Sequence, residues 1–287
     1  MIKVEHIQVF NFEGAIRGMR NPLNSWDKSD SGNGCCKSTN YQKFVLCDNC
    51  PEECVDNALC DRGNSYYQIG ENDLALMHRL YAAGKDGNVA HRKFMRQIFV
   101  CMDITAPDYF FKEFSTYKVG VTENSTSTMH RIHAKEFTLD DFSHEHLYDK
   151  VLAYCPKRIL ENQIEALNFW RNRYLETKDK HDWWQLIQLL PMSYNYTRTI
   201  TMNYENVANM IKQRSGHKLD EWNEFVDILW ELPYMKEIAE NDKVVTRADK
   251  IKSMNDQELA RYLITEISDL SDLSVDDLCK WLREVQE

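Results

Sequence analysis

Residues 203–217 have the sequence NYENVANMIKQRSGH, which carries the clearest helical pattern of polar residues in the chain. Four of its residues, spaced i, i+4, i+7 and i+11, share one face of a straight helix: Asn203, Val207, Met210 and Arg214. Burying an amide or a guanidinium without a partner costs several kcal/mol. Either the two polar groups are satisfied inside the protein, or Arg214 reaches a phosphate or pyrimidine carbonyl in a pocket. Ser215-Gly216 then ends the helix and directs His217 toward the same place.

Helical spacing also occurs on both sides of this stretch. The apolar pattern predicts a strand over residues 3–10 and a loop or irregular strand over 118–129. It predicts helices from Glu71, over 91–99, after Pro107, and over 157–177, 183–190, 203–214 and 219–232. The sum is an α+β fold in which helix dominates.

The composition limits the class of protein. The chain has 287 residues, a net charge of -10, 43% hydrophobic and 11% aromatic residues, so it can bury enough apolar area to fold. No stretch of about 18 uncharged apolar residues is present, which argues against a membrane span. Residues 1–6 lack the apolar core of a secretory signal, and we expect a cytoplasmic protein. The acidic balance argues against binding a nucleic-acid polymer but permits a local cationic pocket for one nucleotide.

Six of the nine cysteines lie between Cys35 and Cys60. Clustered cysteines in a reducing compartment more often bind metal than form disulfides. Cys47-x-x-Cys50 has the spacing of a close zinc-binding pair, so a structural zinc site is one interpretation and a loop of free thiols is the other. A catalytic role is disfavoured because no histidine lies in the segment.

Changes in composition suggest where the parts of the chain meet. The core domain spans residues 1–238, with a Cys-rich insertion over 31–66, and a small helical appendage spans 239–287. Within the appendage, residues 247–260 resemble a helical segment found in proteins of gut-bacterial phages.

A second polar cluster begins at Thr116-Tyr117-Lys118. Hydroxyl and amide residues follow it, namely Thr122, Asn124, Ser125, Ser127 and Thr128. Such a segment is either an anion cradle or a solvated loop. His91 stands alone before it, and a lone histidine is either structural or functional.

These landmarks together resemble one enzyme family. Three landmarks resemble the flavin-dependent thymidylate synthases in their order and nearly in their spacing. The first is the segment from His91 through Ala106-Pro107 to Thr116-Tyr117-Lys118, and the second is the pattern Thr122-x-Asn124-x-x-Ser127. The third is the set Leu190-Pro191, Asn203, Asn209 and Arg214. The chain is similar to that family over most of residues 1–235, apart from the insertion.

The chain departs from the family pattern at several cations. Thr116-Tyr117-Lys118 replaces Arg-His-Arg, the final arginine of the signature falls at Met129, and a nucleotide-binding arginine falls at Ile187. Each missing charge-assisted hydrogen bond is worth about 1.5–3 kcal/mol. Arg131 or Arg198 could substitute; otherwise the pocket binds its nucleotide differently or binds another ligand.

The resemblance implies a fold, a reaction and an assembly. The fold is a central, mostly antiparallel sheet packed with helices, in a homotetramer that binds FAD between subunits. The reaction is reductive methylation of dUMP to dTMP with methylene-tetrahydrofolate and NADPH, and it needs no protein nucleophile.

The resemblance also assigns roles to residues by position. Arg214 is the catalytic residue, which holds and polarises the uracil ring. Asn124, Ser127 and Arg214 bind the substrate. The flavin is lined by His91, Tyr117, Lys118, Asn203, Asn209 and His217.

Two other functions stay open at this point. One is a related flavin- and folate-dependent enzyme that modifies another pyrimidine nucleotide. The other is a non-catalytic descendant that keeps the fold and acts as a binding protein.

Overall fold

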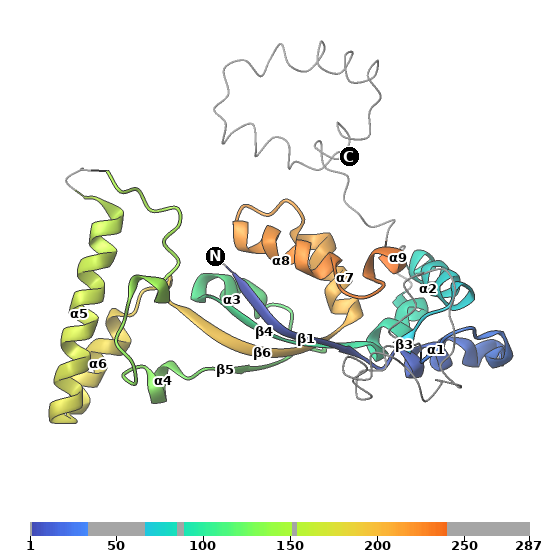
Figure 1. Ribbon diagram of the computed structural model, residues 1–287, viewed down its shortest axis with the longest axis horizontal. Helices are drawn as coiled ribbons and strands as arrows, with labels where there is room; N and C mark the ends of the chain where they lie inside the picture. The colour runs from blue at the N-terminus through green and yellow to red at the C-terminus, as the bar shows by residue number, and fades with distance from the viewer. Residues whose placement is uncertain (1, 34–66, 85–88, 151–153, 240–287) are drawn as a thin grey trace, which may run out of the picture.

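The computed structural model describes residues 2–33, 67–84, 89–150 and 154–239 (Figure 1). Most of the Cys-rich insertion, including Cys47 and Cys50, lies outside the described residues, as does nearly all of the appendage over 239–287. The zinc site and the appendage helices therefore stay predictions. No helix within the described ranges is long and apolar enough to cross a membrane. The same ranges hold no group of three metal-binding side chains.

A four-stranded antiparallel sheet forms the centre of the molecule. Its strands lie in the order β1 (Lys3–Phe10), β4 (Phe99–Pro107), β6 (Asn195–Asn203) and β5 (Thr122–Ser125). A helix-rich α+β fold with a central antiparallel sheet is thereby confirmed. The strand predicted over residues 3–10 is β1, and the irregular segment 118–129 contains β5.

The helix predicted over residues 91–99 is present in part, because it is a 3-10 helix and it ends at Gln97. Residues Val89–Gln97 form a 3-10 helix, η4, and Phe99 already begins β4. Along β4 every second side chain is fully buried, from Val100 through Met102 and Ile104 to Ala106. This period of two is the pattern of a strand with one covered face, which is why the segment extends rather than coils.

Helices cover one face of the sheet. In Figure 1, α3 (Asp108–Phe114), α7 (Tyr204–Arg214) and α8 (Asp220–Trp230) lie on the same side of it. Their contact is aromatic: the ring of Trp222 lies 4.7 Å from that of Phe110 and stacks on Phe114 at 6.2 Å. The other face is polar, with Asp103 bonded to Thr199 at 2.6 Å and to His6 at 2.9 Å.

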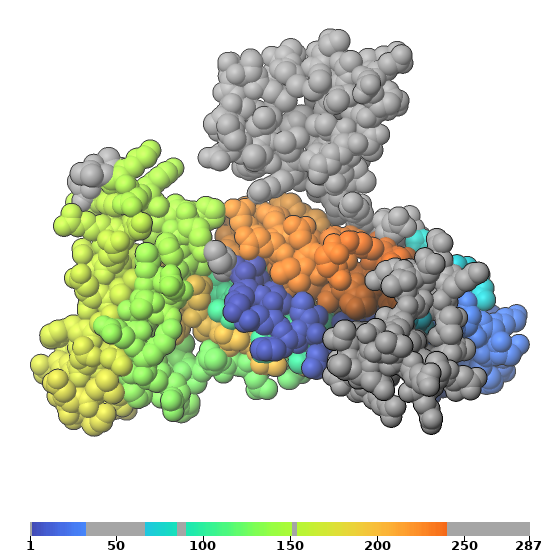
Figure 2. All heavy atoms as spheres, in the orientation of Figure 1, coloured from blue at the N-terminus to red at the C-terminus, as the bar shows by residue number. Residues whose placement is uncertain are grey.

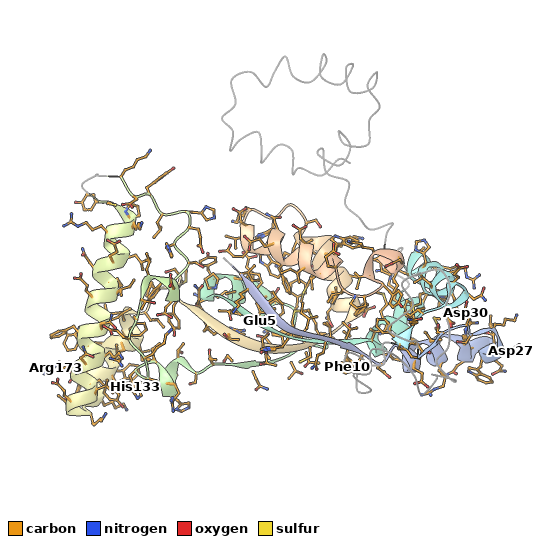
Figure 3. All side chains as sticks on the ribbon, in the orientation of Figure 1. Glu5, Phe10, Asp27, Asp30, His133 and Arg173 are labelled. Atoms are coloured by element: carbon orange, nitrogen blue, oxygen red, sulfur yellow. The ribbon has the colours of Figure 1, made fainter. Side chains whose placement is uncertain are left out.

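Two further groups of helices lie at the ends of the sheet. At one end, α5 (Pro156–Thr177) and α6 (Lys180–Leu189) form a lobe with its own small core, seen beside the central part in Figure 2. His133 and Arg173 mark this lobe in Figure 3. At the other end lie α1 (Phe12–Arg20), α2 (Glu71–Ala83) and α9 (Met235–Ala239). The short elements are η1 (Asn21–Leu23), η2 (Trp26–Lys28), β2 (Gly32–Asn33), β3 (Tyr67–Gln68), α4 (Thr128–Arg131) and η5 (Leu139–Asp141).

A buried ion pair joins α1 to α2. Arg20 Nε donates to Asp73 Oδ1 at 2.6 Å, and the two side chains are only 5% and 0% exposed. The hydroxyls of Ser29 and Ser31 donate to the other carboxylate oxygen at 2.7 and 2.6 Å. Burial alone raises the pKa of Asp73, but the hydrogen bonds from Ser31, Ser29 and Arg20 outweigh it and hold the pKa below its usual value.

We predict that Asp73→Asn lowers the free energy of unfolding by about 3–5 kcal/mol, because it leaves the Arg20 guanidinium buried without a counter-charge. Urea unfolding at neutral pH measures the loss. Because the pKa of Asp73 is lowered by folding, its contribution is complete above about pH 4 and fades as the pH falls through the lowered pKa. The difference between variant and parent therefore shrinks in acid.

Asp27→Asn is the matched control, since Asp27 is an exposed aspartate at the same end of the molecule (Figure 3). Its effect on unfolding is expected to stay within about 0.5 kcal/mol. Equal losses in the two variants would contradict the role given to the ion pair.

Candidate active site

Arg214 lies at the C-terminal end of α7 and is held from three sides. Its Nε donates to the hydroxyl of Tyr117 at 3.1 Å, and its Nη1 donates to the Glu113 carboxylate at 2.9 Å. The guanidinium also stacks over Trp222, 4.7 Å from the ring centroid. Of the two interpretations of Arg214, the first is what the structure has: the charge is paired within the protein, and this pairing fixes the guanidinium in one orientation. The reach of Arg214 toward a ligand stays a prediction. No described group accepts a hydrogen bond from Nη2, so that edge keeps its donors free for a carbonyl.

His217 completes this group, at the turn where α7 ends. The backbone N–H of Leu219 donates to its Nδ1 at 3.2 Å, so the neutral ring carries its proton on Nε2, which lies 3.2 Å from Glu113. Burial lowers the pKa of His217, and the nearby Arg214 acts in the same direction while Glu113 opposes them. The ring is therefore neutral near pH 7 and serves as a hydrogen-bond donor.

Asn203 has a structural task of its own at the start of α7. Its side-chain oxygen accepts from the backbone N–H of Asn206 at 3.0 Å, and Asn206 returns the bond to the Asn203 N–H at 3.3 Å, which makes a capping box. The Asn206 amide also donates to Val119 O at 2.8 Å. Gly120 packs so closely on Asn203 that an added Cβ would lie 2.6 Å from the amide nitrogen, and its φ is +76°. The start of α7 thereby fixes the turn that follows Lys118.

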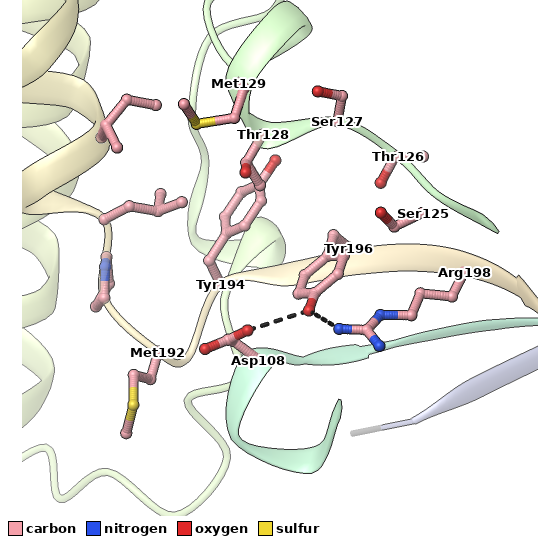
Figure 4. Close-up of a pocket in the computed structure, with 13 residues that line it drawn as sticks. Asp108, Ser125, Thr126, Ser127, Thr128, Met129, Met192, Tyr194, Tyr196 and Arg198 are labelled. Carbon is pink, nitrogen blue, oxygen red and sulfur yellow. Dashed lines mark hydrogen bonds between the residues drawn. The ribbon is translucent and has the colours of Figure 1, made fainter. Parts of the chain in front are cut away.

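A cavity of about 390 Å³ lies between β5, β6 and the α6 end of the lobe (Figure 4). Ser127, predicted to bind substrate, lines it, and its hydroxyl caps α4 by accepting from the His130 N–H at 3.0 Å. Asn124 stands one residue before the lining segment, on β5 opposite Thr199. The cavity is therefore built around the hydroxyl-rich segment that was singled out from the sequence.

A chain of hydrogen bonds crosses the floor of the cavity. Arg198 Nη2 donates to the hydroxyl of Tyr196 at 2.5 Å, and that hydroxyl donates to Asp108 at 3.1 Å (Figure 4). Arg198 Nη1 donates to the hydroxyl of Ser115 at 3.0 Å and pairs with Glu123. The guanidinium also stacks over Phe111 at 4.2 Å. Arg198 is thus fixed in place with both Nη1 hydrogens in use.

The two positions to which the resemblance assigns arginines of the family meet in this cavity. Met129 and Ile187 both line it, although they come from α4 and α6. Of the two substitutes considered from the sequence, Arg198 lines the cavity and Arg131 does not. Arg198 is therefore the cation that this cavity keeps.

The nine predicted site residues fall into separate groups in one chain. Arg214 contacts both Tyr117 and His217, whereas Ser127 lies at the cavity, whose lining does not include Arg214. His91 lines a second cavity of about 340 Å³ beside α1. Lys118 is exposed and Asn209 half-exposed, and neither side chain has a hydrogen-bond partner among the described residues.

These unpartnered groups fit the chemistry of a flavin nucleotide. A cationic side chain such as Lys118 suits a phosphate, and amide and imidazole groups such as Asn209 and His91 suit the polar edges of a flavin or adenine ring. Each cavity is near the small end of the usual range for ligand pockets, about 300–1,000 Å³. A dinucleotide would therefore extend beyond either of them.

Four important side chains were missed from the sequence: Glu113, Trp222, Glu123 and Tyr196. Glu113 had a detectable signal, because it is a carboxylate inside the aromatic run Tyr109–Phe114. Glu123 had none, since its role comes from pairing with Arg198 across strands β5 and β6. Tyr196 precedes Arg198 by two residues on β6, a spacing that puts both side chains on one face of a strand.

The chain matches no protein-family model and no curated protein sequence. Solved structures do share its fold. Thymidylate synthase X from Helicobacter pylori, crystallised with FAD and dUMP, is 16% identical with a TM-score of 0.51, and the match covers 84% of this chain and 98% of that one. The UMP/dUMP methylase PolB from Streptomyces cacaoi, bound with 5-Br dUMP, is 11% identical with a TM-score of 0.51 and coverages of 84% and 95%. At these identities the likeness concerns the fold, and the fold is that of the thymidylate synthase X type.

Proposed function

We propose that this chain is a flavin-dependent enzyme of the thymidylate synthase type, which methylates a uracil ring. The observation that carries the proposal is the oriented Arg214 guanidinium, whose Nη2 edge has no partner among the described residues while Tyr117, Glu113 and Trp222 fix the rest. A shared fold alone does not establish an activity, so the proposal depends on this site. The resemblance implies dUMP as substrate, with a related pyrimidine as the alternative.

Arg214 would act on the uracil carbonyl. Two N–H donors on Nη2 can bind a carbonyl oxygen, and the full positive charge favours the negative charge that develops on that oxygen as the ring is activated. Because Tyr117 and Trp222 hold the guanidinium before substrate arrives, little reorganisation is needed in the transition state.

Glu113 would position the side chains of Arg214 and His217 relative to each other. Its carboxylate bonds to Arg214 at 2.9 Å and lies 3.2 Å from His217 Nε2, so one group positions both side chains. The neutral, proton-bearing His217 would then present a fixed ring edge to a bound ring system.

FAD, when bound and reduced by NADPH, would supply the hydride for the reaction, and methylene-tetrahydrofolate the carbon. In this chain Lys118, Asn209 and His91 would hold the flavin nucleotide, and Tyr117 would flank it. The homotetramer implied by the resemblance would bring these groups, which lie apart in one chain, to a common site.

The first prediction concerns flavin binding. Purified full-length protein is expected to show the visible absorption of a flavin, either as isolated or after FAD is added. Lys118→Ala is expected to weaken FAD binding about tenfold, because one charge-assisted hydrogen bond of about 1.5 kcal/mol is lost. Titration followed by flavin fluorescence measures both.

Lys28→Ala provides the control, since Lys28 is an exposed lysine near α1. It should bind FAD as the parent does. A colourless protein that does not bind added FAD would refute the proposed function.

The second prediction concerns catalysis. NADPH oxidation that requires methylene-tetrahydrofolate and a uracil compound, tested as dUMP and as its nucleoside, should fall at least 100-fold in Arg214→Ala, the typical cost of losing one such donor. Lys212→Ala, on the exposed side of the same helix, should keep the parent rate. Unchanged turnover in Arg214→Ala, with its FAD binding intact, would show that Arg214 is not catalytic.

A further inference from the structure

The turn that joins α3 to β5 carries Lys118, the cation that the proposed function assigns to the flavin nucleotide. Inside the turn, the Tyr117 N–H donates to Phe114 O at 3.0 Å and the Lys118 N–H donates to Thr116 O at 3.1 Å. The side chain of Val119 is 88% exposed, so its packing contributes little to holding the backbone. The position of Lys118 therefore depends on contacts that reach the turn from another element.

Helix α7 supplies those contacts from both of its ends. Near its start, Asn206 Nδ2 donates to Val119 O at 2.8 Å. At its end, Arg214 Nε donates to the hydroxyl of Tyr117 at 3.1 Å. Within the described ranges, Asn206 is the one side chain that bonds to the backbone of residues 118–120. The turn is thus attached to the same helix that carries Arg214.

The two ends of the Asn206 amide have different tasks. Its Oδ1 accepts from the backbone N–H of Asn203 at 3.3 Å and closes the capping box of α7, while its Nδ2 is the donor to Val119. A carboxylate at this position can close a capping box as well, but it has no hydrogen to offer the Val119 carbonyl. The cap alone therefore does not require an amide, whereas the contact with the turn does.

Gly120 lets the turn lie close against the start of α7. Its φ is +76°, and a Cβ added there would lie 2.6 Å from Asn203 Nδ2 and 3.1 Å from Asn206 Oδ1. A side chain at this position would be strained and would press on both members of the capping box. The place of the turn relative to α7 is therefore set by close backbone contact together with the bond from Asn206.

We propose that Asn206 is a positioning residue for flavin binding, which holds the turn so that the Lys118 ammonium meets a phosphate of the flavin nucleotide. The inference rests on the proposed function and adds a residue that acts through Lys118. The Lys118 side chain is exposed, so its position depends on the backbone that carries it. Because ordering a loop costs free energy when a ligand binds, a turn that is held in advance binds the phosphate more tightly.

Asn206→Asp separates the two tasks, because the carboxylate keeps the acceptor for Asn203 and removes the donor to Val119. In the full-length protein it is expected to keep the unfolding temperature of the parent and to bind FAD about fivefold more weakly, the effect of one neutral hydrogen bond, measured by flavin fluorescence. Asn206→Ala removes both bonds without adding a charge, so it should weaken FAD binding as much and also lower the unfolding temperature. If only Asn206→Asp weakened FAD binding, the cause would be its charge and the proposal would fail.

A double-mutant cycle with Lys118→Ala tests whether Asn206 acts through Lys118. If it does, adding Asn206→Asp to Lys118→Ala changes the FAD affinity by less than about twofold. Independent effects would instead multiply to a loss of about fiftyfold in the double variant. That result, or parent-like FAD binding in Asn206→Asp, would overturn the positioning role and leave the flavin-dependent function standing. A parent protein that binds no FAD would overturn both.

Asn168→Asp is the matched control. Asn168 Nδ2 donates to Phe137 O at 2.9 Å and its Oδ1 accepts from the Phe137 N–H at 2.8 Å, so the substitution removes a comparable donor from a half-buried asparagine. The residue lies on α5, which Figure 1 shows apart from α7. Its FAD affinity should equal that of the parent. If it fell as much as in Asn206→Asp, the cause would be a general loosening of the fold and the proposal would fail.

Discussion

The antiparallel pairing of β4 with β6 is the contact on which the site depends. Its register runs without a break from Phe99 opposite Asn203 to Pro107 opposite Asn195. Helix α3 follows one strand and α7 follows the other, so the two helices start at opposite ends of the pair. The eleven residues of α7 run back over the sheet by about 16 Å, which brings Arg214 to Glu113 near the end of α3. A slip by one residue would turn Arg198 to the other face and break the cavity as well.

How far the fold could be predicted depends on how apolar each covered face is. The helix over residues 157–177 was found because its apolar residues recur at helical spacing, and the strand over 3–10 because apolar and polar residues alternate over part of it. β6 was not, because five of its nine residues are Thr or Asn and only Ile200 and Met202 mark its buried face. In β4 the alternation was present, but Met95 and Ile98 before it also fit a helical spacing. Local pattern is ambiguous there, and tertiary pairing decides the outcome.

The sequence indicated individual residues of the candidate site, but not the residues to which they bond. The face shared by Asn203 and Arg214 was visible from spacing, yet Arg214 bonds to Glu113, 101 residues away in sequence. Asn203 proved to be a helix cap, a local role that the Asn203–Asn206 spacing would have indicated. The resemblance placed Met129 and Ile187 at positions of lost cations, but only the fold shows that both positions line one cavity.

The excess of acidic residues matters because many arginines are bonded to carboxylates. Five such pairs are Arg20 with Asp73, Arg96 with Glu205, Arg173 with Asp182, Arg198 with Glu123, and Arg214 with Glu113. With 45 acidic against 35 basic residues, carboxylates are in excess, and an anionic ligand has to compete with them for each guanidinium. That competition costs most where the pair is shielded from water, as at Arg20, and least where a guanidinium keeps a free edge, as Arg214 does. The same excess of acid therefore occupies these guanidinium groups, while the Nη2 edge of Arg214, which has no partner among the described residues, can still bind a neutral carbonyl.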